Sequence, residues 1–348
     1  MPSLRVLTWH VHGSYLYDLA QTPHEFWLPV QPGRPEGYGG RSGSFRWPDN
    51  VHEIAADDVG SARFDVVLFQ SRRNYEIDAE RLLSDAQRRL PRIYLEHDPP
   101  REHPTDTRHP AADDPGTLIV HVTPFNALMW DNGVAPVRVV EHGVVDPGSR
   151  WTGELERGIV VVNDLAGRGR RLGRDVFEQA AAEVPLDLVG MRSEALGGRG
   201  EVAPPELPGF EARYRFFFHP IRYTSLGLAV CEAMMLGMPV VGLATTELAT
   251  VVENGESGYV DTDVRRLVPA MRELLADRRL AARLGEGARR RALERFSIDR
   301  FARDWDAVFR EVAGSPSAVF TGSPAAVAAT VAGASQGEEA SQGEGAAA

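Results

Sequence analysis

The stretch that decides the fold of this chain reads HPIRYTSLGLAVCEAMMLGMPVVGL and covers residues 219–243. It predicts a loop, then a helix over 227–236, then a strand over 239–243. The loop begins at His219, because a residue that precedes proline disfavours helical geometry. Gly237 is suited to end the helix in a left-handed turn. The apolar run after it is typical of a strand that is buried on both faces of a parallel sheet.

Two features of this stretch point to a ligand. Thr224 and Ser225 are N-cap residue types, so we expect one of them to accept a hydrogen bond from the first turn of the helix. Glu232 lies inside the helix among Leu, Ala, Val, Cys and Met residues. A carboxylate in apolar surroundings costs free energy unless it has a partner. Glu232 is therefore the first functional candidate, and the alternative is a structural ion pair with an arginine such as Arg222.

Length and composition indicate a globular protein of two domains. The chain has 348 residues, of which 43% are hydrophobic and 25% charged, and its net charge is −11. This charge argues against nucleic acid as a partner. With Cys231 as the single cysteine, no disulfide can form within the chain, and no apolar run approaches the roughly 20 residues of a membrane span. We therefore expect a cytoplasmic protein without a transmembrane segment, for which peripheral membrane contact and the oligomeric state stay open.

All 38 basic residues are arginine, because the chain contains no lysine. P-loop NTPases, protein kinases and Schiff-base enzymes each need a lysine amine, so these classes are excluded. A bound phosphate would have to be held by arginine side chains, backbone N–H groups or helix N-termini.

Strands and helices alternate along the chain, which is typical of α/β domains with mainly parallel sheets. The first half is expected to have strands at 5–11, 64–70, 92–96, 117–122 and 137–141 and helices at 15–20, 77–90 and 125–130. After a linker at 145–157, we expect strands at 158–163, 186–190, 216–218, 239–243 and 258–260. The helices expected there are 174–183, 227–236, 246–254, 264–277, 278–295 and 298–312.

Two segments are predicted to lack regular structure. Residues 31–50 form a loop whose length indicates a functional or mobile segment. Residues 191–213 are expected to be irregular, since they are rich in Gly, Pro and Glu. Residues 314–348 consist mostly of Ala, Gly, Ser, Pro and Glu, and we interpret them as a disordered tail because they cannot bury enough apolar surface.

An anion site is indicated by residues 163–174, NDLAGRGRRLGR, which follow a predicted strand. Arginines and glycines before a helix offer guanidinium forks and backbone N–H groups to a phosphate. A solvated arginine-rich turn would explain this loop equally well. However, residues 224–228 also begin a helix, whose N-terminus favours anions. Two such sites in one half of the chain suit a diphosphate, and Gly13, after the first strand, would let a ligand approach the backbone.

Residues 224–241 resemble the donor-site motif of the family 4 retaining glycosyltransferases, E-G-x-G-x-x-x-x-E-A-x-x-x-G-x-P-V-V. Gly227 and Glu232 match its second Gly and second Glu, whereas Thr224 and Ser225 replace its first Glu and first Gly. In this family the second Glu binds the ribose of the nucleotide and the first contacts the donor sugar. The residues that the resemblance places at the donor are Gly13, Asn163, Arg168, Ser225, Leu226, Gly227, Leu228 and Glu232.

Weaker matches extend the resemblance. Asn163 and Arg168 stand where the family has the Arg and Lys of G-R-L-x-x-x-K-G, which hold the diphosphate. His97 with Asp98 is similar to the T-x-H-D element, whose His lies beside the donor sugar, and residues 142–144 are similar to the N-G-V that ends the first domain. Further candidates for phosphate or cleft contacts are Arg170, Arg171, Arg222 and His142.

The resemblance implies the GT-B fold, in which two Rossmann-like domains face a cleft. Residues 1–148 would form the acceptor-side domain, 149–297 the nucleotide-sugar domain, and 298–313 a helix that crosses back onto the first domain. The implied reaction transfers a sugar from a nucleoside-diphosphate sugar to a hydroxyl of a glycan, lipid or small molecule, with retention. Neither a cofactor nor a metal is expected, because members of this fold usually need none. The catalytic candidates are His97, Arg168 and Thr224.

Other function classes stay open. One is a nucleotide-sugar epimerase or hydrolase on the same fold. Another is a non-catalytic carbohydrate- or nucleotide-binding protein, which Thr224 and Asn163 suggest. A metal site on residues 97–109, which contain three histidines and two aspartates, is disfavoured, since histidines six residues apart suit neither one helix face nor a tight hairpin. The nucleotide base, the sugar and the acceptor are not specified by these motifs.

Overall fold

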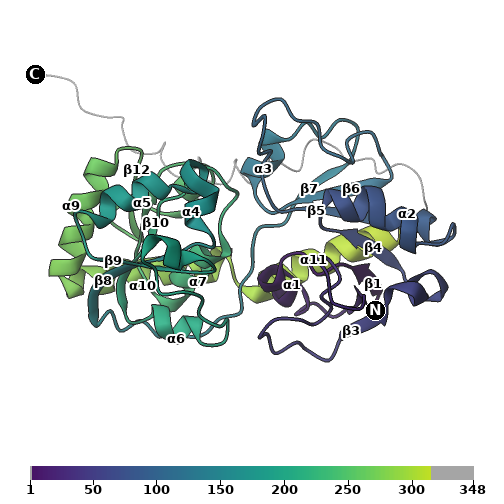
Figure 1. Cartoon of the computed structure of the whole chain (residues 1–348), viewed down its shortest axis with the longest axis horizontal. Helices are drawn as coiled ribbons and strands as arrows, with labels where there is room; N and C mark the ends of the chain where they lie inside the picture. Colours follow the sequence, from purple (N-terminus) through teal and green to yellow (C-terminus); the bar gives the residue numbers. More distant parts are fainter. Residues whose placement is uncertain (1, 315–348) are drawn as a thin grey trace, which may run out of the picture.

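The chain forms two parallel β-sheets that lie side by side along its long axis (Figure 1). The computed structural model describes residues 2–314. The first sheet has the order β3-β2-β1-β4-β5-β6-β7 and the second β12-β11-β10-β8-β9. All neighbouring strands in these two sheets pair in parallel, as expected for an α/β fold.

The first sheet and its flanking helices come from the first 139 residues. Its strands are β1 (Arg5–Thr8), β2 (Glu25–Val30), β3 (Val51–Ala55), β4 (Val66–Phe69), β5 (Arg92–Glu96), β6 (Thr117–His121) and β7 (Val137–Val139). Its helical segments are α1 (Gly13–Leu19), the 3-10 turns η1 (Ala56–Ser61) and η3 (Gln87–Arg89), the π-helical η2 (Asn74–Asp78), α2 (Ala79–Leu82) and α3 (Pro124–Met129).

The second sheet begins after the predicted domain boundary at 148/149. Its strands are β8 (Leu155–Val161), β9 (Leu186–Val189), β10 (Tyr214–His219), β11 (Val240–Leu243) and β12 (Gly258–Asp261). The helical segments are α4 (Leu165–Arg168), η4 (Gly169–Leu172), α5 (Arg174–Ala181), η5 (Ser193–Leu196), α6 (Leu207–Glu211), α7 (Leu228–Leu236), α8 (Leu248–Val251), α9 (Val264–Ala276), α10 (Arg278–Arg295) and α11 (Ile298–Gly314).

The stretch at 219–243 folds as expected into a loop, α7 and β11. All four residues of β11 are buried, and Gly237 ends α7 with a φ of 89°, in the left-handed region. The expected N-cap is wrong. Gly227 precedes the helix and no side chain caps it, because the helix begins three residues beyond Ser225. The side chain of Thr246 instead donates to the Ser225 carbonyl oxygen at 3.3 Å.

The last helix, α11, packs on the first domain although it follows the second (Figure 1). Its apolar side chains join the core of the first sheet, and Trp305 Nε1 donates to the Tyr15 hydroxyl at 3.1 Å. The crossover helix that the resemblance implied is therefore present. Its last residue is Gly314, so the remainder of the predicted tail, 315–348, lies outside the described residues.

The helix predicted at 77–90 is wrong, since the segment forms three short pieces. Asp78 is buried and accepts hydrogen bonds from the Tyr38 hydroxyl and the Asn74 amide, which hold the π-helical turn. Leu83 is extended and ends α2, and Gln87 donates to two carbonyl oxygens of the η1 region. Strands β2 and β3 were missed, and α6 lies in a segment that was predicted to be irregular.

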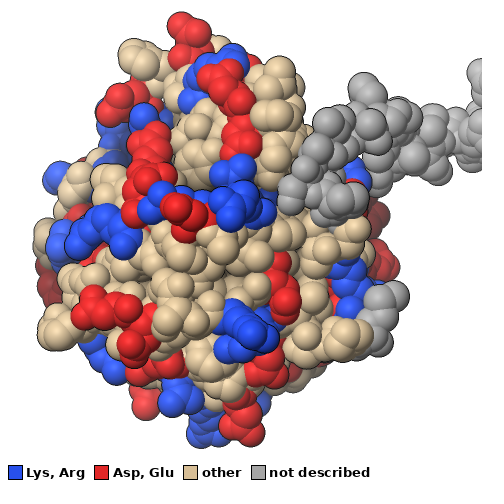
Figure 2. Space-filling view, turned by 90° about the vertical axis from the view of Figure 1, so that its right-hand side faces the viewer, with Lys and Arg blue, Asp and Glu red and all other residues tan. Residues whose placement is uncertain are grey.

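The surface gives two further facts. On the outer face of the first domain, acidic and basic side chains lie interspersed without a broad patch of one sign (Figure 2). Within residues 2–314, no helix combines the length and apolar character that crossing a bilayer requires.

Candidate active site

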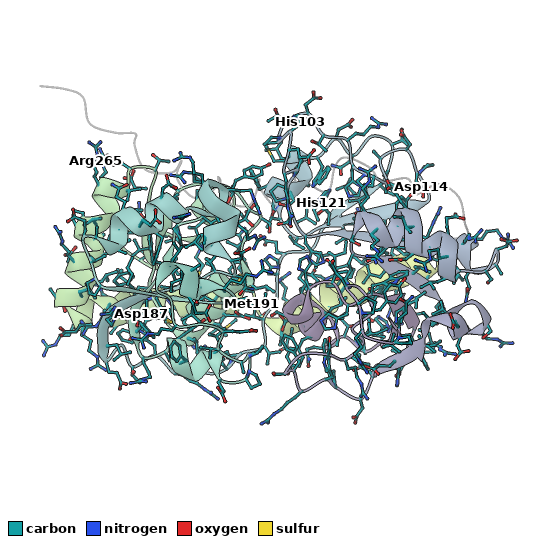
Figure 3. All side chains as sticks on the ribbon, in the orientation of Figure 1. His103, Asp114, His121, Asp187, Met191 and Arg265 are labelled. Carbon is teal, nitrogen blue, oxygen red and sulfur yellow. The ribbon has the colours of Figure 1, made fainter. Side chains whose placement is uncertain are left out.

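The strand order reverses once in each sheet, between β1 and β4 and between β10 and β8. Ligands of open α/β sheets bind outside the carboxyl ends of the strands at such a point. In the second domain these ends face the first domain. Figure 3 shows Met191, which follows β9, on the side toward the first domain, whereas Asp187 within β9 lies farther away. The loops after β8 and β10 therefore meet the first domain between the two sheets.

These two loops are joined closely to each other. The backbone N–H groups of Arg222 and Tyr223, after β10, donate to the Arg171 carbonyl oxygen at 3.1 and 3.2 Å. Gly173 has a φ of 81°, and a Cβ on it would lie 1.9 Å from the Pro220 carbonyl oxygen. Only glycine therefore lets the loop after β8 approach the loop after β10 at this point.

The arginines of these loops fall into two groups. Arg170 and Arg222 both bond to Asp175, with a shortest N–O distance of 2.5 Å in each pair, and Arg174 pairs with Glu178. Arg168 and Arg171, by contrast, make no side-chain hydrogen bond or ion pair with any described residue. Burial, with the charges of Arg101 and Arg168, lowers the pKa of Arg171. The charge of Asp98 opposes this shift but forms no ion pair with Arg171, so two neighbouring cations without an ion-pair partner are suited to bind an anion.

The first domain places imidazoles opposite these arginines. The ring centroids of His12 and His97 are 4.3 Å apart. Burial lowers the pKa of His12, the charge of Asp98 opposes this change, and Arg101 and Arg168 contribute to it. Arg101 itself is bonded to Asp98. Arg168 of the second domain and His12 of the first thus lie close enough to interact across the cleft.

Gln70 fixes the tautomer of His97. Its amide nitrogen donates to Thr8 Oγ1 at 2.9 Å and to the Trp9 carbonyl oxygen at 2.7 Å, so its Oε1 is left to accept from His97 Nε2 at 3.1 Å. Burial and the neighbouring His12 and His142 hold the pKa of His97 well below its usual range. The imidazole is therefore neutral, with Nδ1 as an acceptor.

Glu232 lies unpaired in α7. Its carboxylate has no hydrogen bond or ion pair with any residue of 2–314, and burial raises its pKa to about 7. The alternative of a pair with Arg222 is wrong, because Arg222 bonds to Asp175. Burial raises the pKa values of Asp18 in α1 and Glu211 in α6, and the charge of Glu232 adds to both shifts.

His142 connects the end of the first domain to the start of α7. Its Nε2 donates to the Leu226 carbonyl oxygen at 2.7 Å, and burial lowers its pKa to about 4, so the ring is neutral. Ser225 and Leu226 are buried, which leaves mainly their backbone for a ligand. Thr224 is partly exposed and makes no hydrogen bond with another described residue.

The remaining predicted donor contacts differ in accessibility. Gly227 has open space, since the nearest atom to a Cβ there would be His219 Cε1 at 3.6 Å, and Leu228 is the partly exposed first residue of α7. At Gly13 a Cβ would lie 2.8 Å from the Phe45 ring, so loop 31–50 covers this glycine. Asn163 is exposed, and its Oδ1 accepts from the Met191 backbone at 2.9 Å.

The histidines and aspartates of residues 97–109 do not converge. His103 and Asp106 are exposed, His103 on an outer loop (Figure 3), whereas His109 is buried against Tyr94 and Trp130. Across the described residues, no group of three or more His, Cys, Asp or Glu is arranged to hold a metal ion. Two Asp-x-Asp sequences lie in the described residues, Asp261 with Asp263 and Asp304 with Asp306. Each of these four carboxylates forms an ion pair with an arginine.

Several residues of this site did not stand out in the sequence. Gln70 directly follows the buried strand β4, and a polar residue at the carboxyl end of a parallel strand is a sequence signal for a ligand site. Met191 is 49% exposed at the end of β9, and Asp18 and Glu211 are buried carboxyls. For these last two, no local pattern indicates that the fold brings them near Glu232.

Comparison with known proteins finds a family match within the second domain. Residues 165–277 match the family described as glycosyl transferases group 1. N-acetyl-alpha-D-glucosaminyl L-malate synthase from Bacillus anthracis is 28% identical over 90 residues, 25% of this chain and 24% of that protein. D-inositol 3-phosphate glycosyltransferase from Nocardioides sp. is 34% identical over 134 residues, 38% of this chain and 29% of that protein. The aligned regions thus cover only about a quarter of the length of these curated relatives.

Solved structures share the whole architecture. Sucrose-phosphate synthase from Thermosynechococcus elongatus superposes with a TM-score of 0.68 at 15% identity, covering 90% of this chain and 100% of that one. HepE from Anabaena, in complex with UDP, superposes with a TM-score of 0.64 at 14% identity, covering 89% and 100%. At these identities the likeness shows the fold. Residues 165–277 are therefore similar to the glycosyl transferases group 1 family, within a chain that has the two-domain GT-B fold.

Proposed function

We propose that this protein transfers a sugar, with retention, from a nucleoside-diphosphate sugar to a hydroxyl group of an acceptor. The observation that carries the proposal is the pair Arg168 and Arg171, which have no partner in the described part of the chain and lie where the second sheet reverses its strand order. UDP is the nucleotide we favour, because HepE from Anabaena, which has the same fold, has been solved with UDP and with UDP-glucose.

The proposed roles follow from the positions of the side chains. Arg168 and Arg171, with the free N–H groups at the start of α7, would bind the diphosphate and offset the charge that grows on it as the sugar leaves. Glu232 would accept hydrogen bonds from the ribose hydroxyls. The neutral His97 would contact the donor sugar, with Thr224 on the opposite side. The departing phosphate oxygen would take the proton of the acceptor hydroxyl, so that neither a metal nor a cofactor is required.

The first experiment measures binding of UDP and of uridine by calorimetry. Arg168→Ala and Arg171→Ala should each weaken UDP binding about tenfold or more, because a hydrogen bond to a charged group contributes roughly 1.5–3 kcal/mol. Uridine, which lacks the phosphates, should bind both variants as it binds the wild type. Arg174→Ala is the matched control, since its side chain pairs with Glu178 on the surface of α5. Equal losses for UDP and uridine would contradict phosphate contact.

A second experiment follows the reaction itself. The protein is incubated with UDP-sugars and hydroxyl acceptors, and NMR identifies the anomer formed; inversion would contradict the proposal. Activity should persist in EDTA, and its loss would contradict the metal-free mechanism. A hydrolase or an epimerase on the same fold is the second candidate. Free sugar or an epimer as the main product, with an acceptor present, would favour that candidate.

The acceptor class is suggested by the curated relatives. Their names contain L-malate and D-inositol 3-phosphate, which are both hydroxyl compounds that carry negative charge. We propose a small anionic alcohol as the acceptor, within the wider range of glycans, lipids and small molecules that the fold accommodates.

A further inference from the structure

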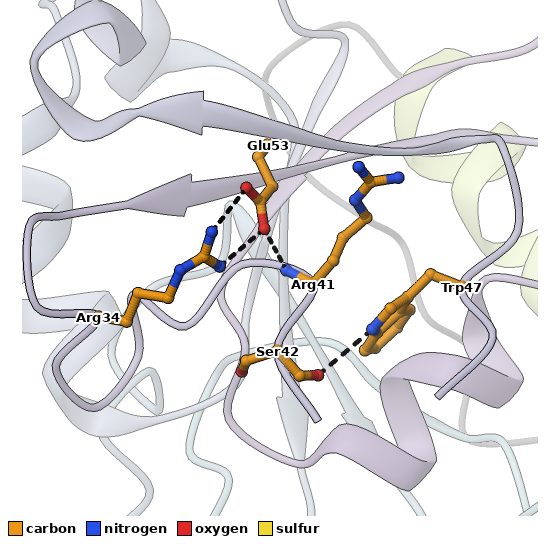
Figure 4. A pocket seen from close by; sticks show the side chains of 5 residues that line it. All are labelled: Arg34, Arg41, Ser42, Trp47 and Glu53. Atoms are coloured by element: carbon orange, nitrogen blue, oxygen red, sulfur yellow. Dashed lines mark hydrogen bonds and ion pairs between the residues drawn. The ribbon is translucent and has the colours of Figure 1, made fainter. Parts of the chain in front are cut away.

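A pocket of about 510 Å³ lies in the first domain between loop 31–50 and β3. Its volume falls in the range of roughly 300–1,000 Å³ that is usual for small-molecule sites. The residues that line it are Arg34, Arg41, Ser42, Trp47 and Glu53 (Figure 4).

The charges in this pocket do not balance. The Glu53 carboxylate accepts from the Arg34 guanidinium at 2.8 and 3.1 Å and from the Arg41 backbone N–H at 2.7 Å, so this anion is satisfied. The Arg41 guanidinium extends away from Glu53 on the side of Trp47 (Figure 4), and it makes no hydrogen bond or ion pair with a described residue. The pocket therefore retains one free positive charge.

Trp47 gives the pocket a fixed apolar wall. Its Nε1 donates to the Ser42 carbonyl oxygen at 3.3 Å, which satisfies its only polar group. Its ring contacts Phe45, with centroids 5.4 Å apart, and His10, at 5.6 Å. A held aromatic ring beside a free guanidinium suits a compound with an apolar or ring-shaped body and an anionic group.

Loop 31–50 is attached next to the proposed reaction centre. His10 follows β1, and its Nδ1 lies 2.6 Å from the Gly40 carbonyl oxygen. Two residues further along, His12 contacts His97 and lies within electrostatic reach of Arg168. The short segment after β1 therefore contacts both regions. His10 contacts the loop that lines the pocket, and His12 lies at the cleft.

We propose that this pocket binds the acceptor, and that the acceptor carries a carboxylate or phosphate group that Arg41 binds while its body contacts Trp47. This inference rests on the proposed transferase function. It adds the acceptor subsite and the residue that selects for negative charge.

The test compares Arg41→Ala with Arg46→Ala. Arg46 is an exposed arginine of the same loop that does not line the pocket, and Arg41→Ala keeps the backbone bond to Glu53. Calorimetry with UDP present measures binding of L-malate, D-inositol 3-phosphate and neutral myo-inositol. Tighter binding of L-malate would indicate a carboxylate, and tighter binding of D-inositol 3-phosphate a phosphate.

At least one of the two anions should bind the wild type more tightly than myo-inositol does. Its dissociation constant should rise about tenfold in Arg41→Ala and stay unchanged in Arg46→Ala, because only Arg41 faces the pocket. Binding of UDP itself should be the same in all three proteins. If UDP binds but neither anion does, or if both variants bind the anions equally well, this inference fails and the proposed function stands. If none of UDP, GDP and ADP binds the wild type, the proposed function fails.

Discussion

Glu232 is the carboxylate that we propose binds the ribose of the donor. It lies in an apolar helix with Asp18 and Glu211 close enough for its charge to raise their pKa values. Burial is the main cause of all three shifts, so it disfavours negative charge on every one of these carboxyls. A ligand that donates hydrogen bonds to Glu232, such as a ribose with two hydroxyl groups, would stabilise the ionised form.

This arrangement predicts that donor affinity depends on pH. With the pKa of Glu232 at about 7, the carboxylate is mostly protonated at pH 6 and mostly ionised at pH 8. UDP-glucose should therefore bind about tenfold more tightly at pH 8 than at pH 6, because affinity scales with the competent fraction. Calorimetry across this range tests it, since the diester phosphates of UDP-glucose keep their charge. Glu232→Gln should bind weakly with little pH dependence, and the exposed Glu206→Gln should behave as the wild type.

The same pKa predicts an opposite effect on stability. The folded-state pKa of Glu232, about 7, lies above its ordinary value of 4.5, so the folded protein holds a proton that the unfolded chain releases between these values. The contribution of Glu232 to the free energy of unfolding therefore falls as pH rises from about 4.5 to 7. In thermal unfolding without ligand, Glu232→Gln should be more stable than the wild type at pH 8 but not at pH 5. A lower Tm for this variant at pH 8 would contradict the unpaired state.

The surroundings and partners of single side chains were partly predictable from sequence. Glu232 stood out because a lone carboxylate in an apolar helix conflicts with its surroundings. The arginines of 163–174 were predicted as a group, yet only the fold decides that Asp175 engages Arg170 while Arg168 and Arg171 stay free. Asp175 bonds to Arg222, 47 positions further on, and such a pairing depends on how two loops meet in space.

The loops after β8 and β10 contact each other, and this contact fixes the backbone geometry of the proposed anion site. Gly173 allows their contact, and the N–H groups of Arg222 and Tyr223 complete it. This arrangement holds the backbone of Arg171 against the loop after β10.

Gly173→Ala should therefore disturb both folding and nucleotide binding. The added Cβ would meet the Pro220 carbonyl oxygen at 1.9 Å, so one loop must move. We expect a loss of stability of more than about 1 kcal/mol and weaker UDP binding. Gly197→Ala is the control, because Gly197 has a similar left-handed backbone, with φ 72°, and no atom within 4 Å of its Cβ position. Thermal unfolding and UDP calorimetry on both variants should show the larger effects at Gly173; equal effects would contradict the clash.

Element prediction succeeded where burial on both faces produces continuous apolar runs, as in β4, β6 and β11. It failed for β2 and β3, which lie toward one edge of the first sheet and carry polar residues and Pro29. It also failed at 77–90, where buried contacts of Asp78 and Gln87 with distant residues override helix propensity. Long-range hydrogen bonds of this kind leave no periodic signal in the sequence.

At the scale of the whole molecule, the two domains are connected by a partly buried charge network. Arg295 at the end of α10 bonds to Glu141, near the end of the first domain, at 2.5 Å and to Glu247 at 2.9 Å. Glu247 in turn accepts from the Phe125 backbone N–H at the start of α3 in the first domain. One arginine thus stabilises contacts on both sides of the cleft.

Arg295→Ala should destabilise the folded protein by about 1–3 kcal/mol, because it leaves the buried Glu247 carboxylate without its cation. Chemical unfolding measures the change. Arg291→Ala is the matched control on the same helix, since its ion pair with Glu253 is long, at 3.9 Å, and exposed, and its hydrogen bond goes to the Thr250 carbonyl oxygen and not to a buried carboxylate. A surface pair of this kind contributes about 1 kcal/mol or less. Similar losses in the two variants would mean that the network does not contribute to stability.

The position of α11 has a consequence for how the protein is made. The core of the first sheet includes Phe301, Trp305 and Phe309, which a ribosome adds only after the entire second domain. At typical synthesis rates of roughly 5–20 residues per second, the first domain must wait on the order of 10–30 s for these side chains. During that interval the groove that α11 later fills exposes apolar side chains, among them Leu16 and Val120. The nascent chain therefore has a defined period in which a chaperone would recognise it, and this period ends when its last helix leaves the ribosome.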